Sequence, residues 1–101
     1  MVEGTFYNDV TNEALAGWTV QITGPVTMTA QTNQNGYFSF MNLPDGDYLV
    51  CEAMQQGWTQ AFPNSDTGSE CPGGTFGYRY SLAGSVDGDL TDFRNVAPTA
   101  P

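Results

Sequence analysis

The sequence predicts an all-β sandwich, because two features of its pattern agree. Apolar residues alternate with polar ones in short runs, and no window keeps the spacing of an amphipathic helix. The runs recur about every ten residues and are separated by Gly, Pro, Asn and Asp, the residues of turns. Short strands at this spacing are typical of two packed antiparallel sheets.

Turn chemistry separates the predicted strands. Asn35-Gly36 is a strong hairpin signal, and Pro44-Asp45-Gly46 and Asp87-Gly88 mark two further turns. We expect strands at Val2–Tyr7, Gly17–Thr23, Val26–Thr32, Tyr37–Met41, Asp47–Ala53, Trp58–Phe62, Thr75–Leu82 and Asp89–Arg94.

Two stretches lack the strand pattern. Pro63–Gly74 is rich in turn formers and is predicted to be a loop. Val96–Pro101 carries alternating Pro, which opposes strand pairing and favours an extended linker. We therefore expect one domain at residues 1–95 and a linker at 96–101.

Composition excludes several functional classes. The 101 residues include 2 Lys plus Arg against 11 Asp plus Glu and no His, a formal net charge of −9. Such a chain repels nucleic-acid phosphates and anionic membranes, and it has no apolar stretch long enough to span a bilayer. Without Lys or His, the Ser-His-Asp, Cys-His and Ser-Lys mechanisms are excluded. We expect neither nucleic-acid binding nor membrane insertion nor enzymatic activity.

The cysteine count is even. Cys51 and Cys71 have no third Cys and no His with which to hold a metal, so they favour a disulfide, and two buried free thiols are the alternative. The bridge would close a loop of about 20 residues, contribute roughly 3 kcal/mol, and imply an oxidising, extracellular location.

Three segments together resemble the prealbumin-like B-type repeats of bacterial surface proteins, which include collagen-adhesin B-type and serine-aspartate-repeat B-like domains. The first is Leu15-Ala16-Gly17-Trp18-Thr19-Val20. The second and most specific runs from Asn35-Gly36-Tyr37-Phe38-Ser39-Phe40 through Leu43-Pro44-Asp45-Gly46-Asp47-Tyr48, Val50 and Glu52 to Gly57-Trp58. The third is Asp92-Phe93-Arg94-Asn95. The resemblance implies a seven-stranded prealbumin-like, Ig-like β-sandwich.

The resemblance also implies a site. Many collagen-adhesin B-type domains join a first-strand Lys to a last-strand Asn through an amide bond, assisted by a buried Glu. Glu52 and Asn95 match the Glu and the Asn, whereas counting back from Leu15 places Tyr7 at the Lys position, and the chain has no Lys. We therefore expect a vestigial crosslink site at Tyr7, Glu52 and Asn95, with the disulfide as a substitute restraint.

Strand alternation places Glu52 on the face shared by Tyr48 and Val50. If that face is the core, the carboxyl group must be hydrogen-bonded, to Tyr7 or Asn95, or protonated with a raised pKa. The alternative is a bulge that turns Glu52 to solvent.

The candidate metal ligands are the acidic residues Asp87, Asp89 and Asp92, which superficially resemble a calcium loop. They lack the full twelve-residue pattern and its Glu, so a solvated acidic hairpin is the favoured interpretation. Serine-aspartate relatives carry a calcium loop where this chain has the shorter, carboxylate-poor segment 8–14. We expect no cofactor, with calcium the one metal worth testing.

Aromatic residues suggest an alternative role. Trp58, Tyr78 and Tyr80 could stack on sugar rings, although Tyr78 and Tyr80 share a stripe with Phe76 that is more typical of core packing. Trp18 shares a face with Val20 and Ile22 and is predicted to lie in the core.

These observations lead to one functional hypothesis and an alternative. The chain is expected to be a non-catalytic spacer or stalk module of a bacterial secreted or cell-surface multidomain protein, with neighbouring domains of the same chain as partners. The alternative is a module that binds polysaccharide or a host or surface protein through its aromatic side chains.

Overall fold

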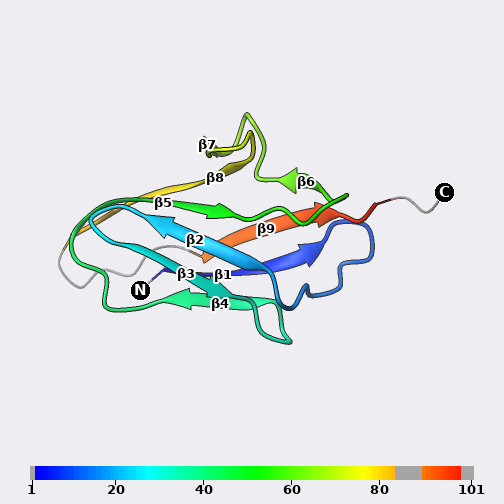
Figure 1. Cartoon of the computed structure of the whole chain (residues 1–101), viewed down its shortest axis with the longest axis horizontal. Helices are drawn as coiled ribbons and strands as arrows, with labels where there is room; N and C mark the ends of the chain where they lie inside the picture. Colours follow the sequence, from blue (N-terminus) through cyan, green and yellow to red (C-terminus); the bar gives the residue numbers. More distant parts are fainter. Residues whose placement is uncertain (1, 84–89, 99–101) are drawn as a thin grey trace.

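Two β-sheets face each other in the computed structural model, which describes residues 2–83 and 90–98 (Figure 1). One sheet has the strand order β4-β1-β9-β6, and the other has the order β3-β2-β5-β8-β7. The strands are β1 (Val2–Asn8), β2 (Thr19–Thr23), β3 (Thr27–Gln31), β4 (Tyr37–Phe40), β5 (Gly46–Glu52), β6 (Thr59–Phe62), β7 (Ser69–Glu70), β8 (Phe76–Leu82) and β9 (Leu90–Val96). The predicted all-β sandwich is confirmed.

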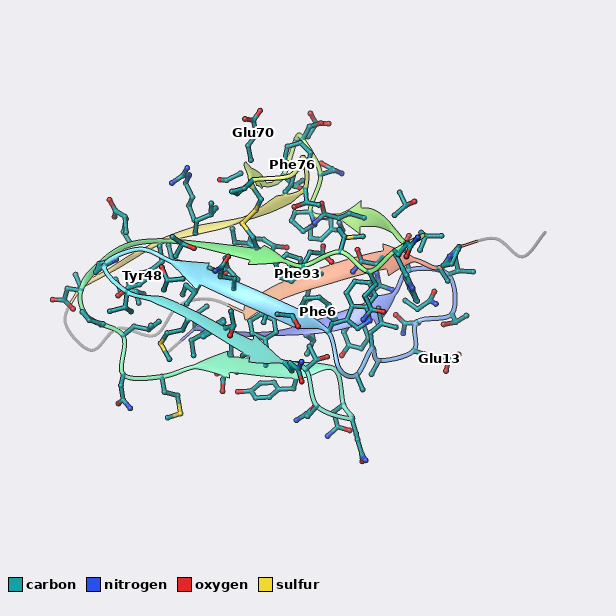
Figure 2. The ribbon with its side chains drawn as sticks, in the orientation of Figure 1. Phe6, Glu13, Tyr48, Glu70, Phe76 and Phe93 are labelled. Carbon is teal, nitrogen blue, oxygen red and sulfur yellow. A yellow bond between two sulfur atoms is a disulfide. The ribbon has the colours of Figure 1, made fainter. Side chains whose placement is uncertain are left out.

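Alternation along each strand builds the core. In β1, Val2, Gly4 and Phe6 are buried while the residues between them are partly exposed. Val20 and Ile22 in β2 and Tyr48 and Val50 in β5 point inward from the opposite sheet. Rings fill the centre, where Phe6 and Phe93 contact each other (Figure 2). Phe38 contacts both of these rings, and Phe6 also contacts the buried ring of Trp18.

The first and last strands of the sandwich are neighbours and run parallel. Their register pairs Glu3 with Leu90 and continues residue by residue to Asn8 with Asn95, while the other strand pairs are antiparallel. A parallel pair of this kind sends the chain in at one end of the sandwich and out at the other, as Figure 1 shows. The long axis of the molecule measures 49 Å against 27 and 19 Å for the other two.

The described residues form nine strands, where the resemblance implied seven. One difference is β7, which lies inside the stretch 63–74 that was expected to be a loop. Ser69 and Glu70 pair with Gly77 and Phe76, and the turn between them is closed by a hydrogen bond from the Cys71 N–H to the Thr75 carbonyl. The strand is too short to show an alternating pattern in the sequence.

The end of the domain also differs from expectation. Val96, expected to begin the linker, is the last residue of β9 and pairs with Thr59 of β6. Pro98 lies beside Gly57, where a Cβ atom would come within 3.2 Å of the proline ring. The exit segment therefore continues along the sandwich for at least these residues.

Candidate functional site

A polar cluster lies inside the largely apolar interior and joins β6 and β9 of one sheet to β5 and β8 of the other. Glu52 at the end of β5 is 6% exposed and Asn95 of β9 is fully buried. The Asn95 side chain donates a hydrogen bond from Nδ2 to Glu52 Oε1 over 2.7 Å. The expected inward orientation of Glu52, and its bond to Asn95, are both observed.

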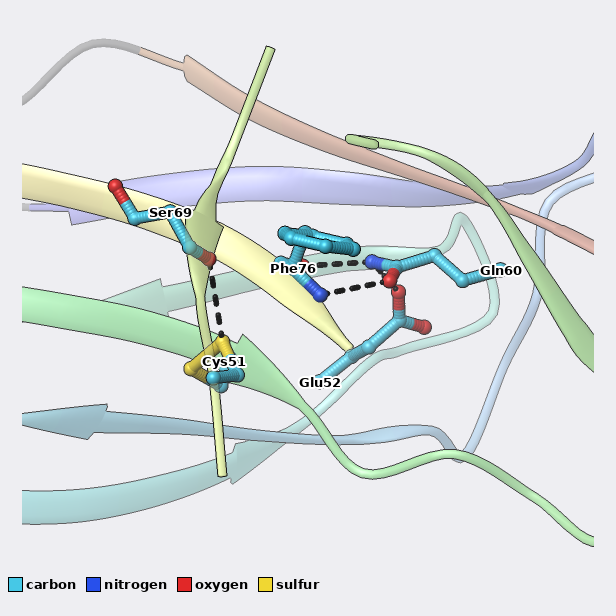
Figure 3. The surroundings of a disulfide bond; sticks show 6 residues. Cys51, Glu52, Gln60, Ser69 and Phe76 are labelled. Carbon is cyan, nitrogen blue, oxygen red and sulfur yellow. Dashed lines mark hydrogen bonds between the residues drawn. A yellow bond between two sulfur atoms is a disulfide. The ribbon is translucent and has the colours of Figure 1, made fainter. Parts of the chain in front are cut away.

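Gln60 of β6 completes this cluster (Figure 3). Its Nε2 donates to Glu52 Oε2 over 2.6 Å and to the Phe76 carbonyl over 2.7 Å, while its Oε1 accepts from the Phe76 N–H over 2.8 Å. The side-chain amide thus pairs with the β8 backbone as another strand would. Together with Asn95, it links the four-stranded sheet to the five-stranded one.

The carboxyl group of Glu52 carries the main electrostatic cost of this arrangement. Burial raises the pKa of Glu52 to about 7, although the hydrogen bonds from Asn95 and Gln60 act in the opposite direction. Asn95 Oδ1 is buried and accepts no hydrogen bond from the residues that the structure describes. The cluster therefore holds a carboxyl group that titrates near neutrality beside a buried acceptor whose bonding capacity is unused.

Tyr7 does not belong to this cluster. Its neighbours in β1, including Phe6, face the core, so alternation turns Tyr7 outward, where the Arg94 guanidinium carbon lies 5.5 Å from the ring centroid. On β1, the inward-facing Phe6 pairs with Phe93, two residues before Asn95, and the residue that pairs with Asn95 itself is Asn8. The alternation of Val2, Gly4 and Phe6 predicts these residues to face inward, whereas the count from Leu15 selects Tyr7, which faces outward.

Gln60 was the residue that sequence reasoning missed. Its strand, Thr59–Phe62, was predicted, but nothing in a single Gln indicates that it will pair with the backbone of a strand 16 residues further along the chain. A polar side chain at an alternating position of a short strand was the only available signal.

The disulfide is present and joins β5 to the residue after β7. Cys51 and Cys71 are bonded with an S–S length of 2.02 Å and a Cα–Cα distance of 6.1 Å. The bridge crosses over Gly77 of β8, where a Cβ atom would lie 2.8 Å from Cys71 Sγ and 1.9 Å from the Val50 carbonyl oxygen. Glycine is therefore required beneath the bridge.

The aromatic candidates do not gather on one surface. Tyr78 and Tyr80 pack against the core, and the Tyr78 hydroxyl donates to the Asp92 carbonyl over 2.7 Å while its ring contacts Phe93. Burial is the main reason that the pKa of Tyr78 rises to about 12. Trp58 lies apart from this pair, edge-on to Trp18 with ring centroids 5.0 Å apart, and it is partly exposed.

The acidic candidates fall partly outside the described residues. Asp87 and Asp89 lie there, and Asp92 is exposed and accepts a hydrogen bond from the Thr5 hydroxyl over 2.5 Å. Within residues 2–83 and 90–98, no group of three or more His, Cys, Asp or Glu side chains is placed to hold a metal.

The segment 8–14, where the resemblance implied a shortened calcium loop, contacts a protein cation. Arg94 Nε contacts Asp9 Oδ1 over 2.8 Å, and Arg94 Nη2 donates to Asn12 Oδ1 over 2.6 Å. These oxygens are of the type that calcium prefers, and here they solvate a guanidinium group.

Comparison with known proteins supports the fold. No family model and no curated protein matches the sequence. Among solved structures, the chain matches a variant of BcpA, the major pilin subunit of Bacillus cereus, with a TM-score of 0.62 and 15% sequence identity. The match covers 94% of this chain and 29% of the BcpA chain. The chain therefore has the fold of one part of a pilin subunit, which agrees with the B-type repeat resemblance. In the described part of the chain, no helix is long and apolar enough to cross a membrane.

Proposed function

We propose that this chain is a non-catalytic spacer module of a bacterial cell-surface or secreted multidomain protein. The observation that carries the proposal is the parallel pairing of β1 and β9, which separates the point where the chain enters from the point where it leaves. A domain of this topology adds its length to a chain of domains without reversing direction. The similarity to a pilin subunit, 15% identical, supports an extracellular structural role.

The same pairing makes the module suited to carry tension. Force applied at the two ends of the chain pulls β1 and β9 past each other, so the hydrogen bonds between Glu3–Asn8 and Leu90–Asn95 are loaded together. Bonds that share a load must break together, whereas strands that are peeled apart lose their bonds one at a time. We therefore expect high resistance to pulling along the chain and low resistance to peeling.

Single-molecule force spectroscopy tests this proposal. In one geometry the domain is pulled through its two termini. In the other it is pulled through linkers attached at Asn8 and Val96 by chemistry that does not use cysteine, and these two residues lie at the same end of the β1–β9 pair. The domain should unfold at clearly higher force in the first geometry. Reduction of the disulfide should add roughly 70 Å to the released contour length, because 20 more residues extend. Equal unfolding forces in the two geometries would contradict a load-bearing spacer.

We further infer that Glu52 and Asn95 are the remains of an amide-crosslink site that has lost its lysine. Phe6 faces the core and pairs with Phe93, two residues before Asn95. A Lys at position 6 would therefore extend along the core side of β1 toward the buried pair, whereas a Lys at position 7 would face outward. Phe6→Lys should therefore lose the mass of one ammonia molecule as the amide bond forms, and Tyr7→Lys should not. A folded Phe6→Lys domain of unchanged mass would argue against this inference.

A further inference from the structure

A cavity of about 420 Å³ opens beside the polar cluster, between β6 and the start of β8. Its walls come from four stretches of the chain: the turn at Met54 and Trp58, the start of β6 at Thr59 and Gln60, the segment 63–65 that follows β6, and the residues 74–76 at the start of β8. The volume falls within the range of small-ligand sites.

The lining combines apolar surfaces with uncharged polar groups. Trp58 and Phe76 contribute partly exposed rings, and Asn64, Ser65 and Thr75 contribute an amide and hydroxyl groups. None of the residues that line the cavity is charged, although the chain as a whole carries −9. This chemistry does not suit a cation or an anion. It suits a neutral molecule with one apolar face and a rim of hydroxyl groups.

The polar groups of the cavity differ in whether their hydrogen-bond donors and acceptors are already used. The Gln60 amide is occupied by Glu52 and Phe76, so it serves as a fixed wall. Asn64 uses Oδ1 for hydrogen bonds within its own turn, and its Nδ2 makes none to the described residues. Within the described part of the chain, the Ser65 and Thr75 hydroxyls make no hydrogen bond. A ligand in the cavity would therefore meet one amide donor and two hydroxyl groups.

The cavity is built before any ligand arrives. Asn64 Oδ1 accepts from the Asp66 and Thr67 N–H groups, which fixes the turn after Pro63. The disulfide at Cys71 ties the far end of the same excursion to β5. The Trp18 ring supports the Trp58 ring through an edge-on contact with an interplanar angle of 87°. Little ordering entropy would be lost on binding.

We propose that this cavity binds a neutral hexopyranose unit of a glycan, with the apolar face of the sugar against Trp58. The Asn64 amide and the Ser65 and Thr75 hydroxyls bond to the sugar hydroxyls. The site is separate from the β1–β9 pair on which the spacer role rests, so each of the two proposals can fail alone.

Binding is tested with the whole oxidised chain on an array of neutral gluco-, manno-, galacto- and N-acetylglucosamine oligosaccharides, with uronic-acid oligosaccharides and proline-rich peptides as competing probes. The best neutral oligosaccharide is then titrated calorimetrically. Asn64→Asp keeps the Oδ1 of the turn and removes the donor, so it should weaken binding at least tenfold. Thr75→Val should weaken it several-fold, while the matched control Thr29→Val on β3 should leave it unchanged.

Trp58→Ala should abolish binding, but this ring also packs on Trp18, so the two conservative variants decide the outcome. No binding of any neutral oligosaccharide to the oxidised chain would overturn the proposal. The same conclusion follows from binding that Asn64→Asp and Thr75→Val leave intact, or from binding only of the acidic or peptide probes.

Discussion

Two segments leave the sandwich and return to it, and they are fastened in different ways. The segment 9–18 between β1 and β2 is held without a covalent bond. Its backbone N–H groups donate to the carbonyls of Phe6, Thr32 and Asn95, and Arg94 forms an ion pair with Asp9 that is about one-third exposed. The segment 63–75, which includes β7, is held by the Cys51–Cys71 disulfide and by the pairing of Gln60 with Phe76. An exposed ion pair contributes at most about 1 kcal/mol, whereas a disulfide of this loop size contributes roughly 3 kcal/mol.

The segment that is tied by the disulfide is the one that lines the cavity. The segment 63–75 contributes walls of the cavity and must keep their shape. The segment 9–18 leads the buried ring of Trp18 into the core and contributes no residue to the cavity lining. The firmer fastening is thus found where a surface has to be preserved.

The largest effect should come from the glycine beneath the disulfide. In Gly77→Ala, the new Cβ would lie 1.9 Å from the Val50 carbonyl oxygen, so β5 and β8 must move apart. We expect a loss of about 3 kcal/mol or more in the free energy of unfolding, measured by urea denaturation. Gly73→Ala is the control, because its Cβ meets nothing within 4 Å and its φ of +90° adds only backbone strain. Equal losses in both variants would mean that crowding beneath the bridge is unimportant.

The second-largest loss of stability should come from removing the Cys51–Cys71 disulfide. We expect the double variant Cys51→Ala, Cys71→Ala to lose roughly 3 kcal/mol. Amide hydrogen exchange should accelerate in the segment 63–75 and stay unchanged in 9–18, because only the first is tied by the bridge. Equal acceleration in both segments would show that the disulfide stabilises the fold globally and not the cavity wall.

The hydrogen-bonded cluster of Glu52, Asn95 and Gln60 should make the stability of the domain depend on pH. The pKa of Glu52 is about 7 in the folded chain and 4.5 in an unfolded one, so the folded state binds more protons between these values. Stability therefore falls as pH rises from 4.5 to 7. Glu52→Gln cannot ionise, so at pH 8 it should be about 2 kcal/mol more stable than the wild type, and this advantage should vanish below pH 4.5.

Denaturation at several pH values measures this difference, and Asp92→Asn, at an exposed carboxylate, serves as its control. A Glu52→Gln variant less stable than the wild type at pH 8 would mean that the ionised carboxylate is favourable where it lies.

The smallest loss of stability is expected from removing the exposed ion pair between Arg94 and Asp9. Arg94→Gln removes the contact to Asp9 and should cost under about 1 kcal/mol, an amount that shrinks further in high salt because the pair is exposed. Thermal melting at two salt concentrations measures it. A loss as large as that of the disulfide variant would remove the contrast between the two segments.

Sequence patterns predict most of this fold and two of the three residues of the polar cluster, Glu52 and Asn95. Alternation in β1, β2 and β5 places the core residues and turns Glu52 inward, because each side chain's face depends on local parity alone. The partner Gln60 and the strand β7 depend on how distant segments meet in space, and no local pattern encodes that. Tyr7 shows the complementary error, since a motif spacing was preferred to the parity of Val2, Gly4 and Phe6.

The separation of the two ends of the chain has an evolutionary consequence. A gene segment that encodes such a domain can be duplicated in tandem, and each copy continues in the direction of the last. Each duplication then lengthens the reach of the protein by at most the 49 Å of the long axis, with no new interface required between copies. Recombination between repeats can then change the length of the protein by one domain at a time.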